Sequence, residues 1–365
     1  MRARLAFRPF WLLSAKFADM TIPDNVQFAA EPAIALKALF AKKNYSQVLI
    51  LADENTRRHC YPLLASSLPG SSVIEVKSGE EQKCLETCVQ IWQKLTDQLV
   101  DRHGCLVVLG GGVLGDMGGF CAATYKRGID FVLVPTTLLA QSDASIGGKL
   151  GIDFNHFKNH IGVFCQPTLT LLHSGFLKTL PLGELRSGFA EIIKHTLISD
   201  KAMWKQLITR GLEAQPWDVL VKHSVEFKAR VTTEDPKEKG LRKILNAGHT
   251  VGHALETHLL TRGAQITHGE AVAAGLVIEA HIAFTRGLLV IEELHEVAQF
   301  ISQVYPRIDI DRETEEAICR LMLQDKKNRD NKILCVLLNG IGHAKWDYEI
   351  NVEEVKNALT FYQTL

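Results

Sequence analysis

The sequence lacks an excess of charge of either sign, because Lys and Arg together number 41 and Asp and Glu together also number 41. This balance removes the electrostatic argument for a nucleic-acid partner or an anionic membrane. Long hydrophobic runs are missing as well: none reaches the roughly 18 residues that would cross a bilayer, so we expect no membrane partner. The eight cysteines include no C-x-x-C pair, which favours reduced thiols in a cytoplasmic protein.

Internal repeats of 20–50 residues and low-complexity tracts are also absent, and 365 residues of 46% hydrophobic composition suffice for two domains with substantial cores. The first residues carry three arginines before the apolar patch Phe10–Leu13. That patch follows Pro9 and is shorter than the ~7–15-residue core of a signal peptide. We therefore expect residues 1–19 to be a disordered extension and Met20 to be the natural start.

The rest of the chain divides into two parts that differ in their pattern of apolar residues. In residues 20–175 the short apolar runs VLIL, SVIEV, CLVVL, FVLVP and LTLL alternate with helical stretches. This alternation predicts an α/β, Rossmann-like NAD-binding domain. Residues 176–365 carry amphipathic segments with few strand signals, which predict a mostly α-helical domain. Its motifs assign it to metal and substrate binding, with the active site expected in the cleft between the two domains. The expected helical segments are 182–198, 200–213, 216–234, 239–259, 268–287, 291–304 and 312–325.

A glycine turn follows the expected strand Cys105–Leu109. Gly110, Gly112 and Gly115 have the G-x-G-x-x-G spacing, in which small residues let amide N–H groups and a helix N-terminus face the pyrophosphate of NAD. The glycines alone also fit a plain tight turn. No acidic residue lies about 20 positions downstream, as the usual fingerprint requires. The candidate for the ribose is instead Asp53, which ends an earlier apolar run.

Glu191 and three histidines form a second group of candidate site residues, in the part of the chain predicted to be helical. Glu191 lies in GFAEIIKH, His249 and His253 lie in NAGHTVGHALE, and His268 opens HGEAV. On a helix, His249 and His253 lie one turn apart on the same face. One carboxylate and two imidazoles with an open position are typical of a catalytic zinc site. Each histidine alone fits a core or surface position, but together, in Gly/Ala-rich helices, they favour the metal.

Cationic and amide residues accompany this group. Lys194 is one turn from Glu191, and Arg242 and Asn246 lie seven and three positions before His249, on nearly the same face of the expected helix. Charged helix residues are mostly solvated surface, but beside a metal they favour an anionic substrate, since Arg binds a carboxylate in bidentate fashion. The full set is Arg127, Lys149, Lys158, Asn159, Lys194, Lys228, Arg242, Asn246, Lys326 and Lys327.

Taken in order, these motifs resemble the 3-dehydroquinate synthase family. The matching strings are ADEN, SGEEQK, GGGVLGDMGGFCAATYKRG, VPTTLLAQSDASIGGKLGI, KNHIGVFCQP, FLKTLP, GFAEIIKH, GLRKILNAGHTVGHALE, HGEAV and DKK. Three places depart from the family pattern. The triplet 173–175 lacks the family's Asp, Cys165 replaces a Tyr, and Val251 replaces an aromatic residue. All three are interpreted as packing variants, and the first two could alter the cofactor pocket.

The resemblance implies a homodimeric lyase of the shikimate pathway, which leads to aromatic amino acids, with NAD and Zn²⁺ or Co²⁺ as cofactors. It would convert 3-deoxy-D-arabino-heptulosonate 7-phosphate to 3-dehydroquinate and phosphate. The steps would be transient NAD-dependent oxidation, phosphate elimination, reduction, ring opening and intramolecular aldol closure.

The resemblance also assigns residues to each role. The NAD contacts would be Asp53, Asn55, Glu80, Lys83, Gly111, Gly112, Val113, Asp116, Thr136, Thr137, Lys149 and Lys158. The metal ligands would be Glu191, His249 and His268. The substrate would be held by Asp143, Lys149, Asn159, Lys194, Lys228, Arg242, Asn246, His253 and either Lys326 or Lys327, with Arg127 reaching across from the second subunit.

Three other functions fit parts of these features. A sugar-phosphate cyclase acting on sedoheptulose 7-phosphate would share the motifs, but its substrate has no carboxylate to pair with Lys228 and Arg242. A metal-dependent NAD polyol dehydrogenase would need the glycine turn and the metal, but not the cationic set. An NAD-binding scaffold with a decayed site would be expected to lack a metal ligand or a phosphate contact, and all of these positions are filled.

Overall fold

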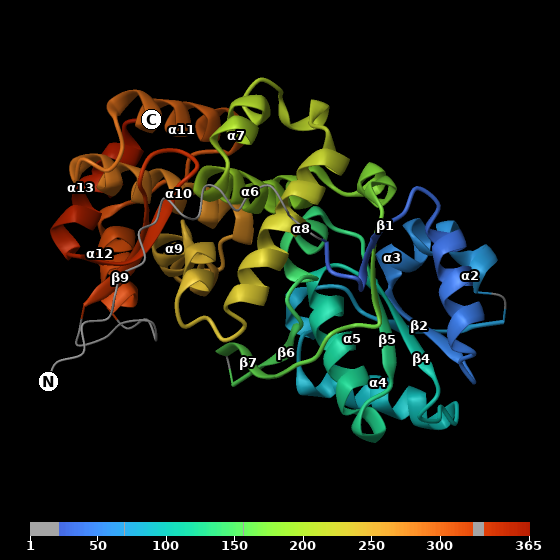
Figure 1. Ribbon diagram of the computed structural model, residues 1–365. Coiled ribbons are helices and arrows are strands. Elements are labelled where there is room, and N and C mark those ends of the chain that lie inside the picture. Colours follow the sequence, from blue (N-terminus) through green and yellow to red (C-terminus); the bar gives the residue numbers. More distant parts are fainter. Residues whose placement is uncertain (1–21, 69, 156, 324–331) are drawn as a thin grey trace, which may run out of the picture.

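The computed structural model describes residues 22–68, 70–155, 157–323 and 332–365. Its first half is built on a parallel sheet, and its second half is mostly helical (Figure 1). The expected fold class, a Rossmann-like part followed by a helical part, is confirmed. The expected extension of residues 1–19 and both lysines of the DKK motif, Lys326 and Lys327, lie outside the described residues.

The main sheet has six parallel strands in the order β1-β8-β5-β4-β2-β3. The five apolar runs predicted as strands all belong to it. Its strands are β1 (Val26–Phe28), β2 (Val48–Asp53), β3 (Ser72–Val76), β4 (Cys105–Gly110), β5 (Asp130–Pro135) and β8 (Leu169–Leu172).

Strand β4 lies inside this sheet and is buried along its whole length. Leu106 and Val108 pack on the face covered by α4 (Leu85–Asp97) and α5 (Gly112–Thr124). Val107 and Leu109 pack on the opposite face, with α2 (Pro32–Lys43). Burial on both faces explains why the strand is a continuous apolar run rather than an alternating one. The short helix α3 (Glu54–His59) follows β2 directly.

The second half packs its helices around one large apolar core. The predicted segments match α6, α8, α10, α11 and α12 closely, whereas α7 ends six residues before its predicted end. The α-helices described in the second half are α6 (Leu182–Ser199), α7 (Lys201–Leu207), α8 (Trp217–Glu234), α9 (His249–Thr261), α10 (His268–Thr285), α11 (Ile291–Val304), α12 (Arg312–Leu323) and α13 (Val352–Gln363).

The prediction of one continuous helix over 239–259 is wrong. The chain forms a 3-10 segment at Leu241–Asn246, turns at Gly248 with φ of +76°, and only then enters α9. The carboxylate of Asp235 accepts three backbone N–H groups of the preceding loop, which stabilises a non-helical path. Arg242 therefore reaches the site from a loop and not from the face of α9.

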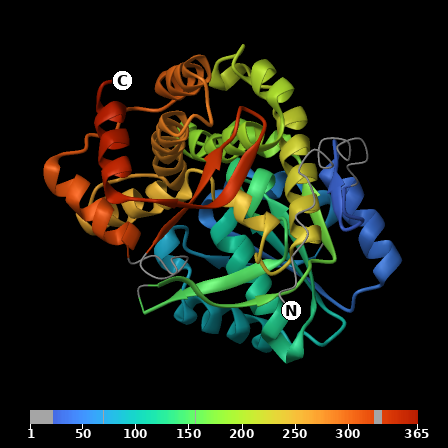
Figure 2. The same cartoon turned by 60° about the vertical axis from the view of Figure 1, so that its left-hand side comes forward.

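Two antiparallel hairpins were not predicted. The first joins β6 (Lys149–Phe154) to β7 (Phe157–Phe164) and carries several of the expected site residues. The second joins β9 (Ile333–Leu338) to β10 (Ala344–Ile350) and packs against the helices of the second half (Figure 2). Within the described ranges, no helix is both long and apolar enough to cross a membrane.

Candidate active site

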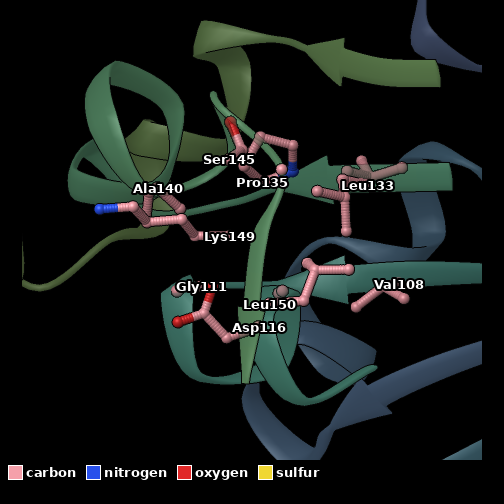
Figure 3. Close-up of a pocket in the computed structure, with 15 residues that line it drawn as sticks. Val108, Gly111, Asp116, Leu133, Pro135, Ala140, Ser145, Lys149 and Leu150 are labelled. Atoms are coloured by element: carbon pink, nitrogen blue, oxygen red, sulfur yellow. The ribbon is translucent and has the colours of Figure 1, made fainter. Parts of the chain in front are cut away.

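A pocket lies at the carboxyl ends of β4 and β5, the edge at which parallel α/β sheets bind their ligands. Its space, including the part open to solvent, is about 360 Å³. Gly111 and Asp116 lie on one side, and Pro135, Ala140 and Ser145 lie on the other (Figure 3).

The glycine turn builds the floor of this pocket. A Cβ atom on Gly111 would lie 2.9 Å from Cγ2 of Thr137, so this position admits no side chain without movement. Helix α5 begins at the next residue, Gly112, and Gly115 has no protein atom within 4 Å of the place where its Cβ would be. The first turn of α5 thus presents bare backbone amides at the pocket, which is an anion-binding arrangement.

The residues expected at NAD fall into two groups. Those that line the pocket are Gly111, Gly112, Asp116 and Lys149. Those that do not line it are Asp53, Asn55, Glu80, Lys83, Val113, Thr136, Thr137 and Lys158. Several of the second group lie at its edge: Thr136 follows β5 and donates its N–H to the Gly110 carbonyl at 3.0 Å. Asp53 ends β2 and caps α3, its carboxylate accepting the Thr56 N–H at 2.7 Å.

Lys83 joins two of these expected contacts. Its buried ammonium donates to Asp116 at 2.6 Å and to Asn159 at 2.5 Å, which ties α5 to the β6–β7 hairpin. Burial raises the pKa of the Asp116 carboxyl, and the Lys83 ammonium partly offsets this effect. Two expected cofactor residues, Lys83 and Asp116, and one expected phosphate residue, Asn159, are therefore joined by hydrogen bonds.

Glu191, His249 and His268 converge from α6, α9 and α10. The Oε1 atom of Glu191 lies 3.3 Å from Nε2 of His249 and 3.4 Å from Nε2 of His268. Ligands that surround one zinc tetrahedrally at about 2.0–2.2 Å are separated by about this distance. The same Oε1 is buried and makes no hydrogen bond within the structure described. A buried, otherwise unsatisfied carboxylate oxygen facing two imidazole nitrogens fits a divalent metal.

Both imidazole rings are oriented by acceptors behind them. Nδ1 of His249 lies 2.9 Å from the Ala247 carbonyl, and Nδ1 of His268 lies 3.0 Å from the Glu256 carboxylate. A proton on each Nδ1 leaves the Nε2 lone pair directed at Glu191, which is how outer acceptors prepare histidine for a metal. Glu256 is in turn paired with Lys158 at 2.9 Å. Burial opposes its ionisation, but His268 and Lys158 lower the pKa of Glu256 to about 2.

His253, expected at the substrate, belongs to the same cluster. Its ring centre lies 4.9 Å from that of His249, as one helical turn requires, and 5.8 Å from that of His268. The three histidines present nitrogen atoms within 4.8 Å of one another. The structure therefore offers His253 as a further candidate ligand or as a neighbour of a metal-bound substrate.

Charged pairs lie next to Glu191 and its neighbours. Lys194 donates to Glu191, and both side chains are buried. Burial opposes the charge on Glu191, but Lys194 and His249 hold the pKa of this carboxyl well below its usual range. Lys228 is 2.6 Å from the Asp143 carboxylate, and Nε2 of His195 is 3.3 Å from the other oxygen of Asp143. Burial lowers the pKa of Lys228, against the effect of Asp143.

The remaining expected substrate residues lie around Glu238. Its carboxylate accepts from Lys149 at 2.8 Å and from Asn246 at 2.8 Å. The buried Arg242 donates to the Pro236 carbonyl, and its guanidinium lies 3.1 Å from where a Cβ of Gly147 would be. These contacts bring the 3-10 loop before α9 against the segment that leads into β6.

One segment connects the pocket with the charged cluster. Asp143 pairs with Lys228, and its neighbour Ala144 lines the pocket and lies opposite Gly112. Arg127 lies apart from these residues, beyond the end of α5 that is remote from the glycine turn, where it is exposed and has φ of +70°.

Three titratable residues of this site were missed from the sequence. Glu256 lies three residues after His253, and His195 lies four residues after Glu191, so helical periodicity could have placed both on the site face. Glu238 gives no such signal, because it lies between the predicted helical segments 216–234 and 239–259.

Replacing Glu256 with alanine is expected to weaken metal binding about 10- to 100-fold, because loss of a carboxylate behind a metal-bound imidazole has this effect. Competition with a chromogenic chelator would measure the dissociation constant. The exposed Glu313→Ala on α12 is the matched control, with unchanged affinity. Equal affinity of Glu256→Ala and the parent protein would refute this role.

A comparison with solved structures gives the class of the protein. The chain is similar to 2-epi-5-epi-valiolone synthase of Streptomyces hygroscopicus, solved with NAD⁺ and Zn²⁺ bound, with a TM-score of 0.83 and 27% identity over 94% of this chain and 98% of that one. The fold is that of the sugar-phosphate cyclases.

Sequence comparisons narrow this class to a family. The models of the 3-dehydroquinate synthase N-terminal and C-terminal domains match residues 73–187 and 188–328. The 3-dehydroquinate synthase of Parabacteroides distasonis is 36% identical over 90% of this chain and 94% of its own length. That of Sulfurovum sp. is 41% identical over 84% of this chain and 87% of its own length. The chain belongs to the 3-dehydroquinate synthase family.

Proposed function

We propose that the protein converts 3-deoxy-D-arabino-heptulosonate 7-phosphate to 3-dehydroquinate and phosphate, the lyase activity of its family. The observation that carries this proposal is the segment Asp143–Ala144, which contacts both the nucleotide pocket and the charged cluster beside Glu191. A cofactor in the pocket and a metal at Glu191 would therefore meet the same small substrate.

The residues divide between two cofactors. NAD would bind at Gly111, Gly112, Asp116 and Lys149, which line the pocket, and at the other expected contacts, which do not line it. Zn²⁺ or Co²⁺ would be held by Glu191, His249 and His268, with His253 beside them. When bound, NAD supplies a transient oxidation and reduction at one carbon, and the metal polarises the oxygen on that carbon. The similarity to a solved enzyme that holds NAD⁺ and Zn²⁺ supports this assignment.

The remaining side chains would bind and orient the substrate. We assign its carboxylate to Arg242 and Lys228, and its phosphate to Asn159 and a lysine of the DKK motif. Asp143, Lys149, Lys194 and Asn246 would fix the hydroxyl groups, and His253 would hold the phosphate in the orientation in which it leaves. Lys194 and Lys228 are buried, as residues of a closed anion site must be.

The buried guanidinium of Arg242 favours this substrate over sedoheptulose 7-phosphate. In the structure Arg242 donates to the Pro236 carbonyl. The carboxylates of Glu238, Asp143 and Asp235 favour its charged form. A substrate carboxylate would give the guanidinium a bidentate partner, which sedoheptulose 7-phosphate lacks. A polyol dehydrogenase would gain nothing from Lys194, Lys228 and Arg242, so the same set of cations argues against that activity.

The quaternary structure proposed is a homodimer. Helix α5 has 13 residues and is therefore about 20 Å long, and Arg127 lies beyond the end remote from its own glycine turn. From that place Arg127 can contribute to a site only in another subunit. Light scattering should give twice the mass of the chain at micromolar concentration, and a monomer that retains full activity would contradict this.

The domain boundary and the cellular location of the protein are proposed from its secondary structure and its cysteines. We place the domain boundary at 175/176, between the last sheet strand, which ends at Leu172, and α6, which begins at Leu182. We place the enzyme in the cytoplasm, because its eight cysteines are free and most are buried.

Metal removal tests the proposed function. Protein treated with a chelator should lose phosphate release from the heptulosonate substrate and recover it when Zn²⁺ or Co²⁺ is added. Full turnover after chelation, with no divalent ion present, would contradict the assignment of Glu191, His249 and His268.

Gly115→Ala separates cofactor binding from folding. The added methyl group meets no protein atom, and alanine is better than glycine in a helix by about 0.5–1 kcal/mol, so thermal stability should rise slightly. The methyl group would crowd a ligand in the pocket that Gly115 lines, at a cost of about 1–3 kcal/mol, so NAD affinity should fall about 5- to 150-fold. Calorimetric titration with NAD measures this, and unchanged affinity would move the dinucleotide away from this turn.

A further inference from the structure

The carboxylate of Glu279 lies in an unusual place for a charged group. It belongs to α10, and its side chain is only 3% exposed. Its two oxygens accept the backbone N–H groups of Gly248 at 2.5 Å, Thr250 at 3.1 Å and Val251 at 3.3 Å. These amides belong to the first turn of α9, whose own N-cap residue is a glycine and supplies no side-chain cap.

His249 lies between the amides that Glu279 holds. Helix starts have amides with no partner inside the helix, and these amides are usually satisfied by the residue just before the helix. Here a residue 31 positions further along the chain does so. The position of the first turn of α9, and hence that of His249, is therefore held by α10 in addition to the local turn at Gly248.

The backbones of α9 and α10 pack closely, which brings Glu279 within hydrogen-bond distance of the first turn of α9. A Cβ on Gly275 would lie 2.0 Å from the Gly248 carbonyl oxygen, and a Cβ on Gly252 would lie 2.9 Å from that of Ala271. Gly248 thus faces Gly275, and Gly252 faces Ala271, so the helices run antiparallel in direct backbone contact. Any larger residue at Gly275 would separate α9 from Glu279.

Helix α10 also fixes the third metal-binding helix. Gly269 donates its N–H to the Ser187 hydroxyl at 3.1 Å, and a Cβ on Gly269 would lie 2.1 Å from the Ser187 carbonyl oxygen. Ser187 is one turn before Glu191 on α6. Helix α10 therefore provides His268 itself, holds α6 through Gly269, and holds α9 through Glu279.

We propose that Glu279 is a positioning residue for the metal site: it anchors the first turn of α9 so that His249 meets Glu191 and His268. The proposal rests on the proposed metal site and adds a residue that touches neither metal nor substrate. Burying an ionised carboxylate between α9 and α10 is unfavourable in free energy. This is seen in the pKa of Glu279, which burial raises to about 7 although three backbone N–H groups donate to the carboxylate. A site that depends on the position of His249 explains why the fold keeps a carboxylate there.

The test compares E279Q with the parent protein. Glutamine has nearly the same volume but only one acceptor oxygen, and its NH₂ group would face amide donors. We expect Co²⁺ and Zn²⁺ affinity, measured without substrate by chelator competition, to fall about tenfold or more, in the range known for residues behind metal ligands. We also expect faster amide hydrogen exchange at 248–251 in metal-free E279Q. The shorter E279D should lie between the two proteins, and it takes the place of E279Q in the same measurements if E279Q does not fold.

The matched control is E354Q. Glu354 caps the start of α13, where it accepts the Asn351 N–H at 2.9 Å, and it is bonded to no residue of the metal cluster. Its replacement should lower thermal stability without changing metal affinity. Unchanged affinity in E279Q, or an equal loss in E354Q, would overturn the positioning role. If His249→Ala also kept its metal, the proposed metal site itself would be wrong, and this outcome is distinct from failure of the Glu279 proposal alone.

Discussion

Replacing His249 with alanine is expected to lower kcat for the heptulosonate substrate about 100- to 10,000-fold and to abolish stoichiometric metal binding. His249 contributes one of the nitrogens that face Oε1 of Glu191, so its loss leaves one carboxylate and one imidazole of the proposed ligand set. A bound metal supplies several kcal/mol of transition-state stabilisation, and each 1.4 kcal/mol is about tenfold in rate. Elemental analysis of the purified variant and a phosphate-release assay measure the two effects.

The control for this variant is His295→Ala, which removes an exposed imidazole from α11. It should retain the metal content and kcat of the parent protein. A His249→Ala protein with parental turnover would show that this cluster is not where the chemistry occurs. Parental metal content with lost turnover would instead assign His249 to the substrate.

Replacing Arg242 with alanine is expected to lower kcat/KM about 30- to 5,000-fold. Removing one member of a buried, hydrogen-bonded charge pair costs about 2–5 kcal/mol, and the substrate carboxylate is the proposed partner. Arg242→Lys should recover only part of this loss, because lysine keeps the charge but cannot bind a carboxylate in bidentate fashion. Steady-state kinetics with the heptulosonate substrate measure both variants.

Lys243→Ala is the neighbouring control for Arg242. Its ammonium is 2.6 Å from Asp347 on β10, away from the pocket, so kcat/KM should be unchanged. An Arg242→Ala protein with parental kcat/KM would remove the carboxylate from this part of the site. It would also remove the main argument against sedoheptulose 7-phosphate as the substrate.

Local patterns predicted much of the fold because buried parallel strands need continuous apolar runs. CLVVL and FVLVP became β4 and β5 for this reason, and the glycine turn expected after β4 leads directly into α5. The sequence of β9, ILCVLL, is also a continuous apolar run. It was not predicted as a strand because the segments around it have the amphipathic pattern of helices.

The errors in the site have two causes: local hydrogen bonds interrupt a helical periodicity, and some pairs join residues distant in sequence. The stretch 239–259 has helical periodicity, yet Asp235 and Gly248 divide it, so Arg242 and Asn246 reach the site from a loop. Lys149 and Lys158 were expected at the cofactor or substrate, but their partners, Glu238 and Glu256, were not identified. Neither pairing follows from periodicity, because each joins a strand of the β6–β7 hairpin to a residue some 90 positions away.

The central claim is that the protein is a cyclising lyase with no net redox change. The most direct test measures phosphate release from 3-deoxy-D-arabino-heptulosonate 7-phosphate by the purified protein with NAD and Zn²⁺. Sedoheptulose 7-phosphate is run in parallel, and NADH absorbance is recorded throughout. We predict phosphate from the heptulosonate only, without accumulation of NADH. NADH accumulating without phosphate would indicate a dehydrogenase, and phosphate from sedoheptulose 7-phosphate alone would indicate another cyclase; either result would contradict the account.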